Sequence, residues 1–256
     1  MGIEQGKQKL NQLSFNADKV TIVPFGDNHL GSKDFDRKLF KEHIRWVARS
    51  PNTYALFMGD QLEAATRNSV GAGVYEQQEI IDDQIEDWIK IVKPLAKVGK
   101  VIGLHKGNHE DRVWKDSGVD ITKMMCKTLD VPYLGWTVMH YIKIKDQVYT
   151  MYTTHGSSGA KLPHTKIKAC IDRANVADAD IYVMAHLHAL DHHTRQYYKI
   201  DKRSRRVVQG ERHFIICGSY IEHWDSYAEH AGMEMLKLGS PKIKLSGKKK
   251  QVRVSL

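Results

Sequence analysis

The sequence is short of cysteine and lacks any long apolar run. Its three cysteines, Cys126, Cys170 and Cys217, are odd in number and far apart, which favours reduced thiols over a disulfide framework or a paired-cysteine zinc site. No run approaches the roughly 20 apolar residues of a membrane span, and the N-terminus lacks the apolar core of a signal peptide. We therefore expect a cytoplasmic protein that makes no membrane contact.

Acidic residues are missing from the end of the chain. The 256 residues, 41% of them hydrophobic, predict one domain over 1–256, and the formal net charge is +9. From Lys237 onward seven Lys or Arg stand without an acid, and seven more between Arg195 and Arg212 oppose only Asp201 and Glu211. This basic region, at about 195–256, indicates either a polyanionic partner such as nucleic acid or a solvated tail and loop.

Apolar periodicity predicts alternating strands and helices. We expect a loose lead-in over 1–18, a helix over 35–48 capped by Ser32 to Asp34, and a helical insert at about 64–95 that Pro94 ends. Further helices are predicted at 121–129 and 163–174. Strands are predicted at 20–25, 54–58, 98–104, 137–145, 148–154, 181–184, 197–201, 213–217, 242–245 and 251–255. The β-α-β order at the start indicates a layered α/β fold.

Potential metal ligands follow several of these strands. In open α/β sheets, residues just past the carboxyl ends of strands converge in one crevice. Seven oxygen and nitrogen donors suit two ions that share a carboxylate, and their mixture without thiolates favours Mn, Fe, Zn, Co or Ni, with Mn placed first. The seven are Asp27, His29, Asp60, Asn108, His155, His186 and His188.

The same residues fall into five ordered blocks. Asp27-x-His29, Gly59-Asp60, Gly107-Asn108-His109-Glu110, His155 and His186-x-His188 resemble the blocks of the calcineurin-like metallophosphoesterases, over roughly residues 20–190. The resemblance implies a four-layered α/β/β/α fold, a central β-sandwich flanked by helices. It also implies that Asp27, His29 and His188 hold one ion and Asn108, His155 and His186 the other.

The resemblance implies roles for the remaining residues of the blocks. Asp60 would bridge the two ions, a metal-bridging hydroxide would attack phosphorus, and His109 would face the substrate as general acid. Two positions depart from the family pattern: Ala185 stands where Gly is usual, and Glu110 where Asp is commoner. Neither departure removes a ligand.

Other residues outside the ligand set each have two possible roles. Arg112, three residues past His109, suits either a substrate phosphate clamp or an ion pair with Asp111 or Asp116. Tyr220 and Trp224 suit either base stacking or the core. Nine histidines outside the blocks are interpreted mostly as surface or interface residues: His43, His105, His140, His164, His192, His193, His213, His223 and His230.

The sequence therefore predicts a dinuclear metal-dependent phosphoesterase that cleaves phosphodiester bonds in nucleic acid or nucleotides. One alternative is a phosphomonoesterase or nucleotide pyrophosphohydrolase. A second alternative, from another class, is a metal-site scaffold without catalysis. Metal identity, oligomeric state and the role of the long insert after Asp60 are left open.

Overall fold

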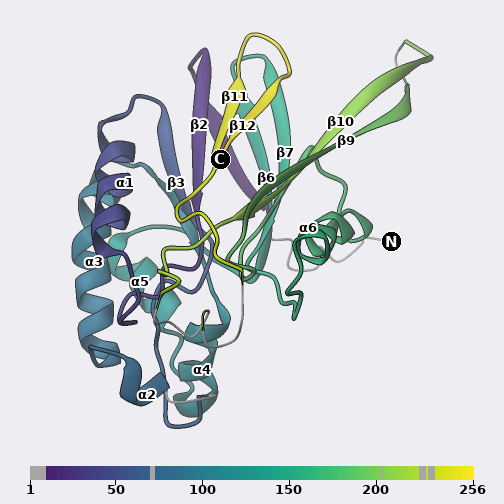
Figure 1. The fold of residues 1–256 in the computed structure, drawn as a ribbon. Coiled ribbons are helices and arrows are strands. Elements are labelled where there is room, and N and C mark those ends of the chain that lie inside the picture. Colours follow the sequence, from purple (N-terminus) through teal and green to yellow (C-terminus); the bar gives the residue numbers. More distant parts are fainter. Residues whose placement is uncertain (1–9, 70–72, 203, 225–228, 230–233) are drawn as a thin grey trace, which may run out of the picture.

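The structure, a computed structural model, describes residues 10–69, 73–202, 204–224, 229 and 234–256. Within these residues the strands form two six-stranded sheets (Figure 1). The first sheet has the order β12 (Val252–Ser255), β11 (Lys242–Ser246), β2 (Lys19–Phe25), β3 (Thr53–Phe57), β4 (Val101–His105) and β5 (Tyr133–Gly135). The second has the order β1 (Leu10–Phe15), β6 (Thr137–Ile144), β7 (Gln147–Thr154), β8 (Ile181–Met184), β10 (Arg206–Cys217) and β9 (Leu190–Asp201).

Helices cover the outer face of each sheet. The helices are α1 (Arg37–Arg49), α2 (Gly73–Glu76), α3 (Ile81–Lys97), α4 (Asn108–Ser117), α5 (Ile121–Leu129) and α6 (Pro163–Ile171), followed by a 3-10 turn at Asp172–Asn175. The side chains of α1, α3 and α5 pack on the first sheet around Phe57 and Trp88. Cys170 of α6 packs on the second sheet near Tyr182 and Phe214.

A third apolar cluster fills the space between the sheets. It joins Ile22 and Leu56 of the first sheet to Ile142, Met151 and Ile215 of the second. Because β2 is buried along all but its first residue, its apolar run has to face a core on both sides. The four layers α/β/β/α that the resemblance implies are therefore confirmed.

Most predicted elements are present with small shifts at their ends, although β9 and β10 each begin seven residues before the predicted strands at 197–201 and 213–217. Three expectations are wrong. The lead-in is not loose throughout, because β1 pairs in parallel with β6 as an edge strand. Pro94 does not end the insert helix: α3 continues to Lys97, and Leu95 beyond the proline is fully buried in the core. The first helix is capped by Asp36, whose carboxylate accepts from Leu39 N at 2.8 Å, and not by Ser32 to Asp34.

Helix α4 was not predicted at all. Its only buried residue is Glu110, so it has no apolar stripe that periodicity could detect. The Glu110 carboxylate accepts from Gly107 N at 2.9 Å, which satisfies one free amide at the helix start. Asn108 and His109 consequently lie on the first turn of a helix.

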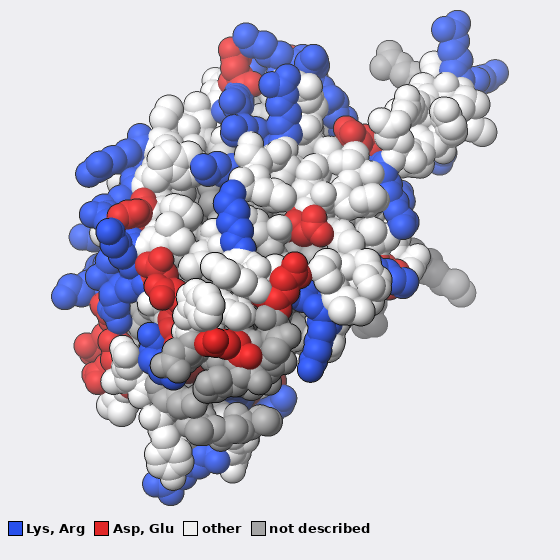
Figure 2. Space-filling model, in the orientation of Figure 1, with Lys and Arg blue, Asp and Glu red and all other residues white. Residues whose placement is uncertain are grey.

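The basic region at about 195–256 supplies strands to both sheets, β9 and β10 to one and β11 and β12 to the other. Beyond the sheet, β9 and β10 extend as a long ribbon that stands away from the body (Figures 1 and 2). None of the helices described is long and apolar enough to cross a membrane.

Candidate metal centre

Loops from both sheets meet at one end of the sandwich. Asp27 and His29 follow β2, Asp60 follows β3 and Asn108 follows β4. His155 follows β7, while His186 and His188 follow β8. Since β2, β3 and β4 are parallel, as are β7 and β8, their carboxyl ends bring these loops to one edge. The structure places all seven predicted ligands together.

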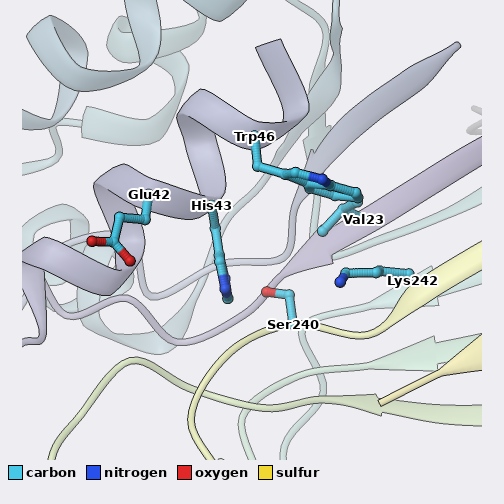
Figure 3. Close-up of a pocket in the computed structure, with 6 residues that line it drawn as sticks. All are labelled: Val23, Glu42, His43, Trp46, Ser240 and Lys242. Carbon is cyan, nitrogen blue, oxygen red and sulfur yellow. The ribbon is translucent and has the colours of Figure 1, made fainter. Parts of the chain in front are cut away.

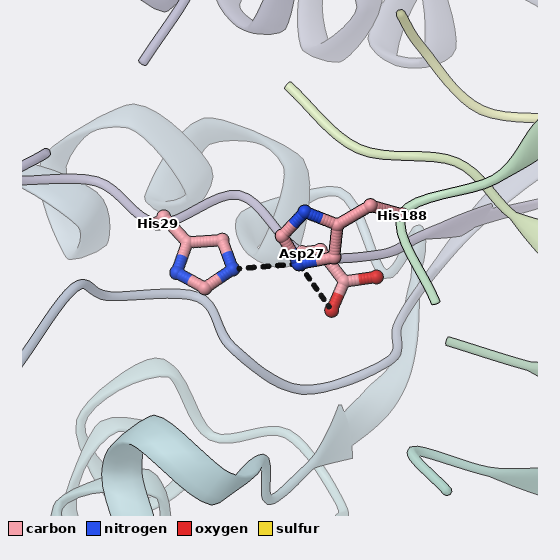
Figure 4. Close-up of side chains that lie close together, drawn as sticks. All are labelled: Asp27, His29 and His188. Atoms are coloured by element: carbon pink, nitrogen blue, oxygen red, sulfur yellow. Dashed lines mark hydrogen bonds and ion pairs between the residues drawn. The ribbon is translucent and has the colours of Figure 1, made fainter. Parts of the chain in front are cut away.

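The first group contains Asp27, His29 and His188, whose ligand atoms lie within 4.8 Å of one another (Figure 4). The Nε2 atoms of His29 and His188 are 3.2 Å apart, and His188 Nε2 is 3.8 Å from Asp27 Oδ1. Asp27 is completely buried. This is the set of residues predicted for one ion.

The second group contains Asp60, His155 and His186, also within 4.8 Å. Asn108 joins it, because its Oδ1 lies 2.9 Å from His155 Nε2 and 2.8 Å from His186 Nδ1. Asp60 Oδ2 is 3.4 Å from His155 Nε2 and 3.9 Å from Nε2 of His29 in the first group. Asp60 therefore lies between the two groups, where a bridging ligand has to be.

Nitrogen and oxygen lone pairs in this cluster point toward one another, and a positive charge between them would remove their repulsion. His155 Nδ1 donates to Met58 O at 2.9 Å, so in the neutral ring Nε2 points a lone pair at the oxygens of Asn108 and Asp60. His29 Nδ1 donates in the same way to Glu63 Oε2 at 3.1 Å, which leaves its Nε2 lone pair facing His188. Lone pairs at these distances repel unless a proton or a metal ion lies between them, and the donor set fits a divalent metal.

The pKa values in the cluster also indicate that its surroundings stabilise positive charge. Burial raises the pKa of Asp27 to about 7, despite the opposing field of His155. Burial acts against charge on His155 and His29, yet Asp60 raises the pKa of His155 to about 9 and Glu63 raises that of His29 to about 9. Burial would also raise the pKa of Asp60, but His155 and His109 hold it well below its usual range. The cluster retains cationic charge at neutral pH even without a metal.

Five of the seven ligands have backbone angles that side chains rarely adopt. The φ angles are 38° at Asp27, 50° at His29, 50° at Asp60, 69° at His186 and 52° at His188. Such left-handed conformations cost energy in residues other than glycine, and they concentrate at functional sites. Ala185 has no positive φ, so the family's usual glycine is not required there.

Two carboxylates support the cluster: Glu110, which sequence reasoning placed in a block without a role, and Glu63, which it missed. Glu110 accepts from Asp60 N and Leu62 N, both at 3.1 Å, and so ties the β3 loop to the start of α4. Glu63 orients His29 through its carboxylate and accepts from His109 Nδ1 at 2.7 Å through its backbone oxygen. The signal for Glu63 was its place three residues after Asp60, in the same ligand loop.

His109 lies beside the cluster, with both ring nitrogens engaged. Its Nδ1 donates to Glu63 O, and Arg112 Nη2 donates to its Nε2 at 2.9 Å. Burial lowers the pKa of His109 to about 4, so the ring is neutral here. Arg112 makes this contact and lies 4.0 Å from Glu63 Oε1, and in the structure it forms no ion pair with Asp111 or Asp116.

Several other sequence interpretations change. His105, His140 and His213 are buried and hydrogen-bonded, so they are not surface residues. Tyr220 is fully buried against Phe25 and so cannot stack on a base, whereas Trp224 is exposed. His230 lies outside the described residues.

A pocket of about 260 Å³ lies elsewhere, between α1 and β11 (Figure 3). Its polar groups already contact one another or the protein: Lys242 lies 4.7 Å from the Trp46 ring, and His43 Nδ1 is 2.8 Å from the Tyr220 hydroxyl. It contains none of the candidate ligands. The pocket is lined by Val23, Glu42, His43, Trp46, Ser240 and Lys242.

Comparison with known proteins gives structural similarity only. No protein-family model matches the chain, and no curated protein matches its sequence. A predicted phosphoesterase from Streptococcus pneumoniae TIGR4 has 12% identity over 93% of this chain and 98% of its own, with a TM-score of 0.39. Zinc-complexed Vps29 from Entamoeba histolytica has 12% identity over 92% of this chain and 97% of its own, with a TM-score of 0.41. Similarity at this level does not establish a shared function, so the site is interpreted from its own geometry.

That geometry agrees with the arrangement expected from the sequence. Two packed sheets flanked by helices carry the ordered Asp, Asn and His loops at one edge, and Asp60 lies between two groups of ligands. The fold and the arrangement of the ligands are those that the resemblance to the calcineurin-like metallophosphoesterases implies, and the His and Asp clusters can hold divalent metal.

Proposed function

We propose that this protein is a dinuclear metal-dependent phosphodiesterase that acts on nucleic acid or nucleotides. The observation that carries the proposal is the position of Asp60, whose Oδ2 lies within 4.0 Å of ring nitrogens in His29, His155 and His109. One carboxylate thus adjoins both ligand groups and the candidate acid. Two metal ions held by these groups would activate a water molecule and neutralise the charge that develops on a phosphate ester.

The residues of the cluster would divide the binding of the ions. Asp27, His29 and His188 would hold one ion, Asn108, His155 and His186 the other, and Asp60 both. The outer hydrogen bonds to Glu63 and to the Met58 carbonyl keep each imidazole turned so that Nε2 faces the site. Manganese is the first choice, because the mixed imidazole, amide and carboxylate donors include no thiolate; Fe, Zn, Co and Ni are alternatives.

His109 and Arg112 would act on the substrate. Arg112 donates to His109 Nε2 at 2.9 Å, and a phosphate ester offers the guanidinium a better, charged acceptor. When Arg112 turns to the phosphate, His109 Nε2 becomes free. The added negative charge favours a proton on this nitrogen, from which His109 can protonate the leaving oxygen.

Two alternatives compete with this proposal. A phosphomonoesterase or nucleotide pyrophosphohydrolase would use the same metal ligands and the same acid, so it differs only in how the substrate is held. A scaffold that binds metal without catalysis would need neither His109 nor Arg112 beside the cluster, and the hydrogen-bonded His109–Arg112 pair favours an enzyme.

A substrate panel tests the proposal. Purified protein is supplied with Mn²⁺ and offered bis-p-nitrophenyl phosphate, p-nitrophenyl phosphate, and single- and double-stranded DNA. We expect the diester and DNA to be cleaved faster than the monoester. Faster cleavage of the monoester would favour the first alternative, and stoichiometric metal binding without turnover of any substrate would favour the scaffold.

A further inference from the structure

The ribbon formed by β9 and β10 extends beyond the sheet to which it belongs. Strand β8 pairs with β10 only from His213 to Ile216, whereas β9 and β10 pair with each other from Leu190 to Asp201. The outer part, Arg195–Asp201 with Arg206–Arg212, is here termed the β9–β10 arm. It stands out from the body, with Lys and Arg side chains at its tip (Figure 2). Isolated two-stranded ribbons are marginally stable in water, so we expect a projecting ribbon of this kind to have a binding function.

The register sorts charge onto one face of the arm. Residues directly opposite each other in an antiparallel pair share a face, and so do alternate residues along each strand. One face carries the pairs Arg195–Arg212, Tyr197–Gly210, Lys199–Val208 and Asp201–Arg206, and is here termed the cationic face. The other carries Gln196–Glu211, Tyr198–Gln209 and Ile200–Val207, with no Lys or Arg.

Two of the cations of this face lie against aromatic rings. Tyr197 lies flat against Gly210, where an added Cβ would come within 2.6 Å of the ring. The Arg212 guanidinium lies 4.5 Å from the centre of the Tyr197 ring, and that of Arg195 lies 5.9 Å from the centre of the Phe214 ring. A guanidinium on an aromatic surface is pre-oriented and weakly hydrated, so it binds phosphate at a small cost in side-chain freedom.

Acidic groups near the cationic face do not neutralise it. Asp201 is used in the turn, where its Oδ1 accepts from Ser204 N at 2.6 Å and its backbone oxygen accepts from Arg205 N. Asp178 pairs with Arg212, but its side chain is 87% exposed and the pair is therefore screened by water. Arg195 and Arg212 stand directly opposite each other, an unfavourable pairing of like charges that an anion between them would relieve.

In the other basic segment of the chain, two Lys side chains form ion pairs within the protein. At the β11–β12 turn, Lys248 pairs with Asp18 at 3.0 Å and Lys250 with Asp180 at 2.9 Å. The β9–β10 arm is therefore the better candidate for an external polyanion. Strand β9 begins at Leu190, two residues after the candidate ligand His188, and runs from the metal centre to the arm, which lies beyond the amino end of β8.

From these observations we infer that the cationic face of the β9–β10 arm binds the phosphate backbone of a nucleic acid. The inference rests on the proposed function to the extent that this nucleic acid is the substrate of the metal centre. A twelve-residue strand spans ~40 Å, so a nucleic acid that follows its length is roughly 12 base pairs long. A small aryl ester at the metal centre cannot reach the arm.

Binding of a labelled oligonucleotide in EDTA tests the arm without catalysis. The variant combines Arg195→Gln, Lys199→Gln and Arg206→Gln, and leaves Arg212 on its ring. The matched control removes three exposed cations from α1 with Lys38→Gln, Arg45→Gln and Arg49→Gln. A third protein keeps the charge of the arm, with Arg195→Lys, Lys199→Arg and Arg206→Lys.

We expect the Gln arm variant to bind more weakly at low salt and to lose about 2 from the log–log salt slope on single strands, or about 3 on duplex. The charge-retaining variant and the α1 control should keep the slope of the wild-type protein. An unchanged slope in the Gln arm variant, or an equal loss in the α1 control, would overturn the inference.

Turnover of bis-p-nitrophenyl phosphate with Mn²⁺ separates this inference from the proposed function. All four proteins should hydrolyse this small diester at the same rate, because none of the substitutions touches the cluster. If the wild-type protein does not hydrolyse it while the Gln arm variant still loses its salt slope, the proposed function fails and the inference about the arm stands.

Discussion

Two groups of buried histidines lie close together in this protein and differ in how their lone pairs are used. Between the sheets, Asn11 Nδ2 donates to His140 Nδ1 at 3.3 Å and His140 Nε2 donates to Thr153 Oγ1 at 2.8 Å. The Thr153 hydroxyl donates to His105 Nε2 at 2.8 Å, and His105 Nδ1 donates to Gly135 O at 2.8 Å. Every acceptor in this chain of hydrogen bonds has a donor when both rings are neutral.

At the metal centre, the same count of hydrogen-bond donors and acceptors with neutral rings leaves an acceptor without a donor. His29 and His155 each donate from Nδ1 to an outer oxygen, and the Nε2 atom of a neutral His155 then faces the oxygens of Asn108 and Asp60. Strands β4 and β7 supply residues to both groups, so burial and location do not tell them apart. The balance of hydrogen-bond donors and acceptors distinguishes the two groups. It indicates that one group is a cation site and the other a structural hydrogen-bond network.

The largest effect should follow from removing the carboxylate between the two ligand groups. Asp60→Asn replaces one acceptor oxygen with an amide nitrogen that can only donate, so it should empty at least one ion site and abolish the turnover that depends on both ions. Metal content by elemental analysis, with thermal unfolding as a check of the fold, measures this. Two bound ions with normal turnover would show that Asp60 is not the bridge.

The next effect concerns proton transfer. His109→Ala should keep its metal, because His109 is not one of the proposed ligands, and lose ~10²–10⁴-fold in kcat on esters with poor leaving groups. Activated aryl esters, which need little protonation, should lose much less. His164→Ala, at an exposed position on α6, is the matched control. Equal losses on both kinds of ester, or loss of metal, would remove His109 from the role of acid.

A smaller effect should follow from weakening the outer contact of His29. Glu63→Gln removes the negative charge beside Nδ1, so metal affinity should fall by ~10–100-fold, the usual cost of losing such a partner. Equilibrium dialysis of Mn²⁺ measures this without turnover. Glu63→Asp keeps the charge and should recover part of the affinity. If Glu63→Gln binds Mn²⁺ as tightly as the wild-type protein, the carboxylate does not support the ligand.

The smallest effect concerns the network between the sheets and is a pH dependence. Burial lowers the pKa of His140 to about 4, below the usual value of 6.5. Between these values the unfolded chain binds the proton and the folded chain does not, so stability falls as pH falls through 6.5 and levels off below 4. The loss attributable to His140 should be about 2 kcal/mol between pH 7 and pH 5.

The measurement compares His140→Gln with the wild-type protein by urea unfolding over this pH range in EDTA. The variant should lose less stability toward acid, whereas His164→Gln should follow the wild-type curve. If His140→Gln and the wild-type protein lose stability in parallel, His140 is protonated in the folded state and the neutral network is wrong.

The sequence by itself determined most of the elements and a layered α/β fold, because the signals involved are local, whereas the four layers were implied by the family resemblance. Strand β8 was predicted at its observed ends, since a short apolar run between Asp180 and His186 leaves few choices. Helix α5 was also predicted at its observed ends, and the structure shows that Asp120 caps it. The ligand residues were identifiable because each directly follows a strand, and parallel strands deliver their ends to one edge.

Only the tertiary structure decided which groups lie across the site from one another. Glu63 and Glu110 act on His29 and Asp60 through contacts that depend on how the loops fold, and α4 has no apolar stripe to reveal it. From the sequence, His105 and His140 were interpreted as surface or interface residues, because a histidine's position in the chain does not show whether each ring nitrogen has a hydrogen-bond partner. That depends on the packing of two sheets whose contacting residues, such as Asn11 and His140, are far apart in the sequence.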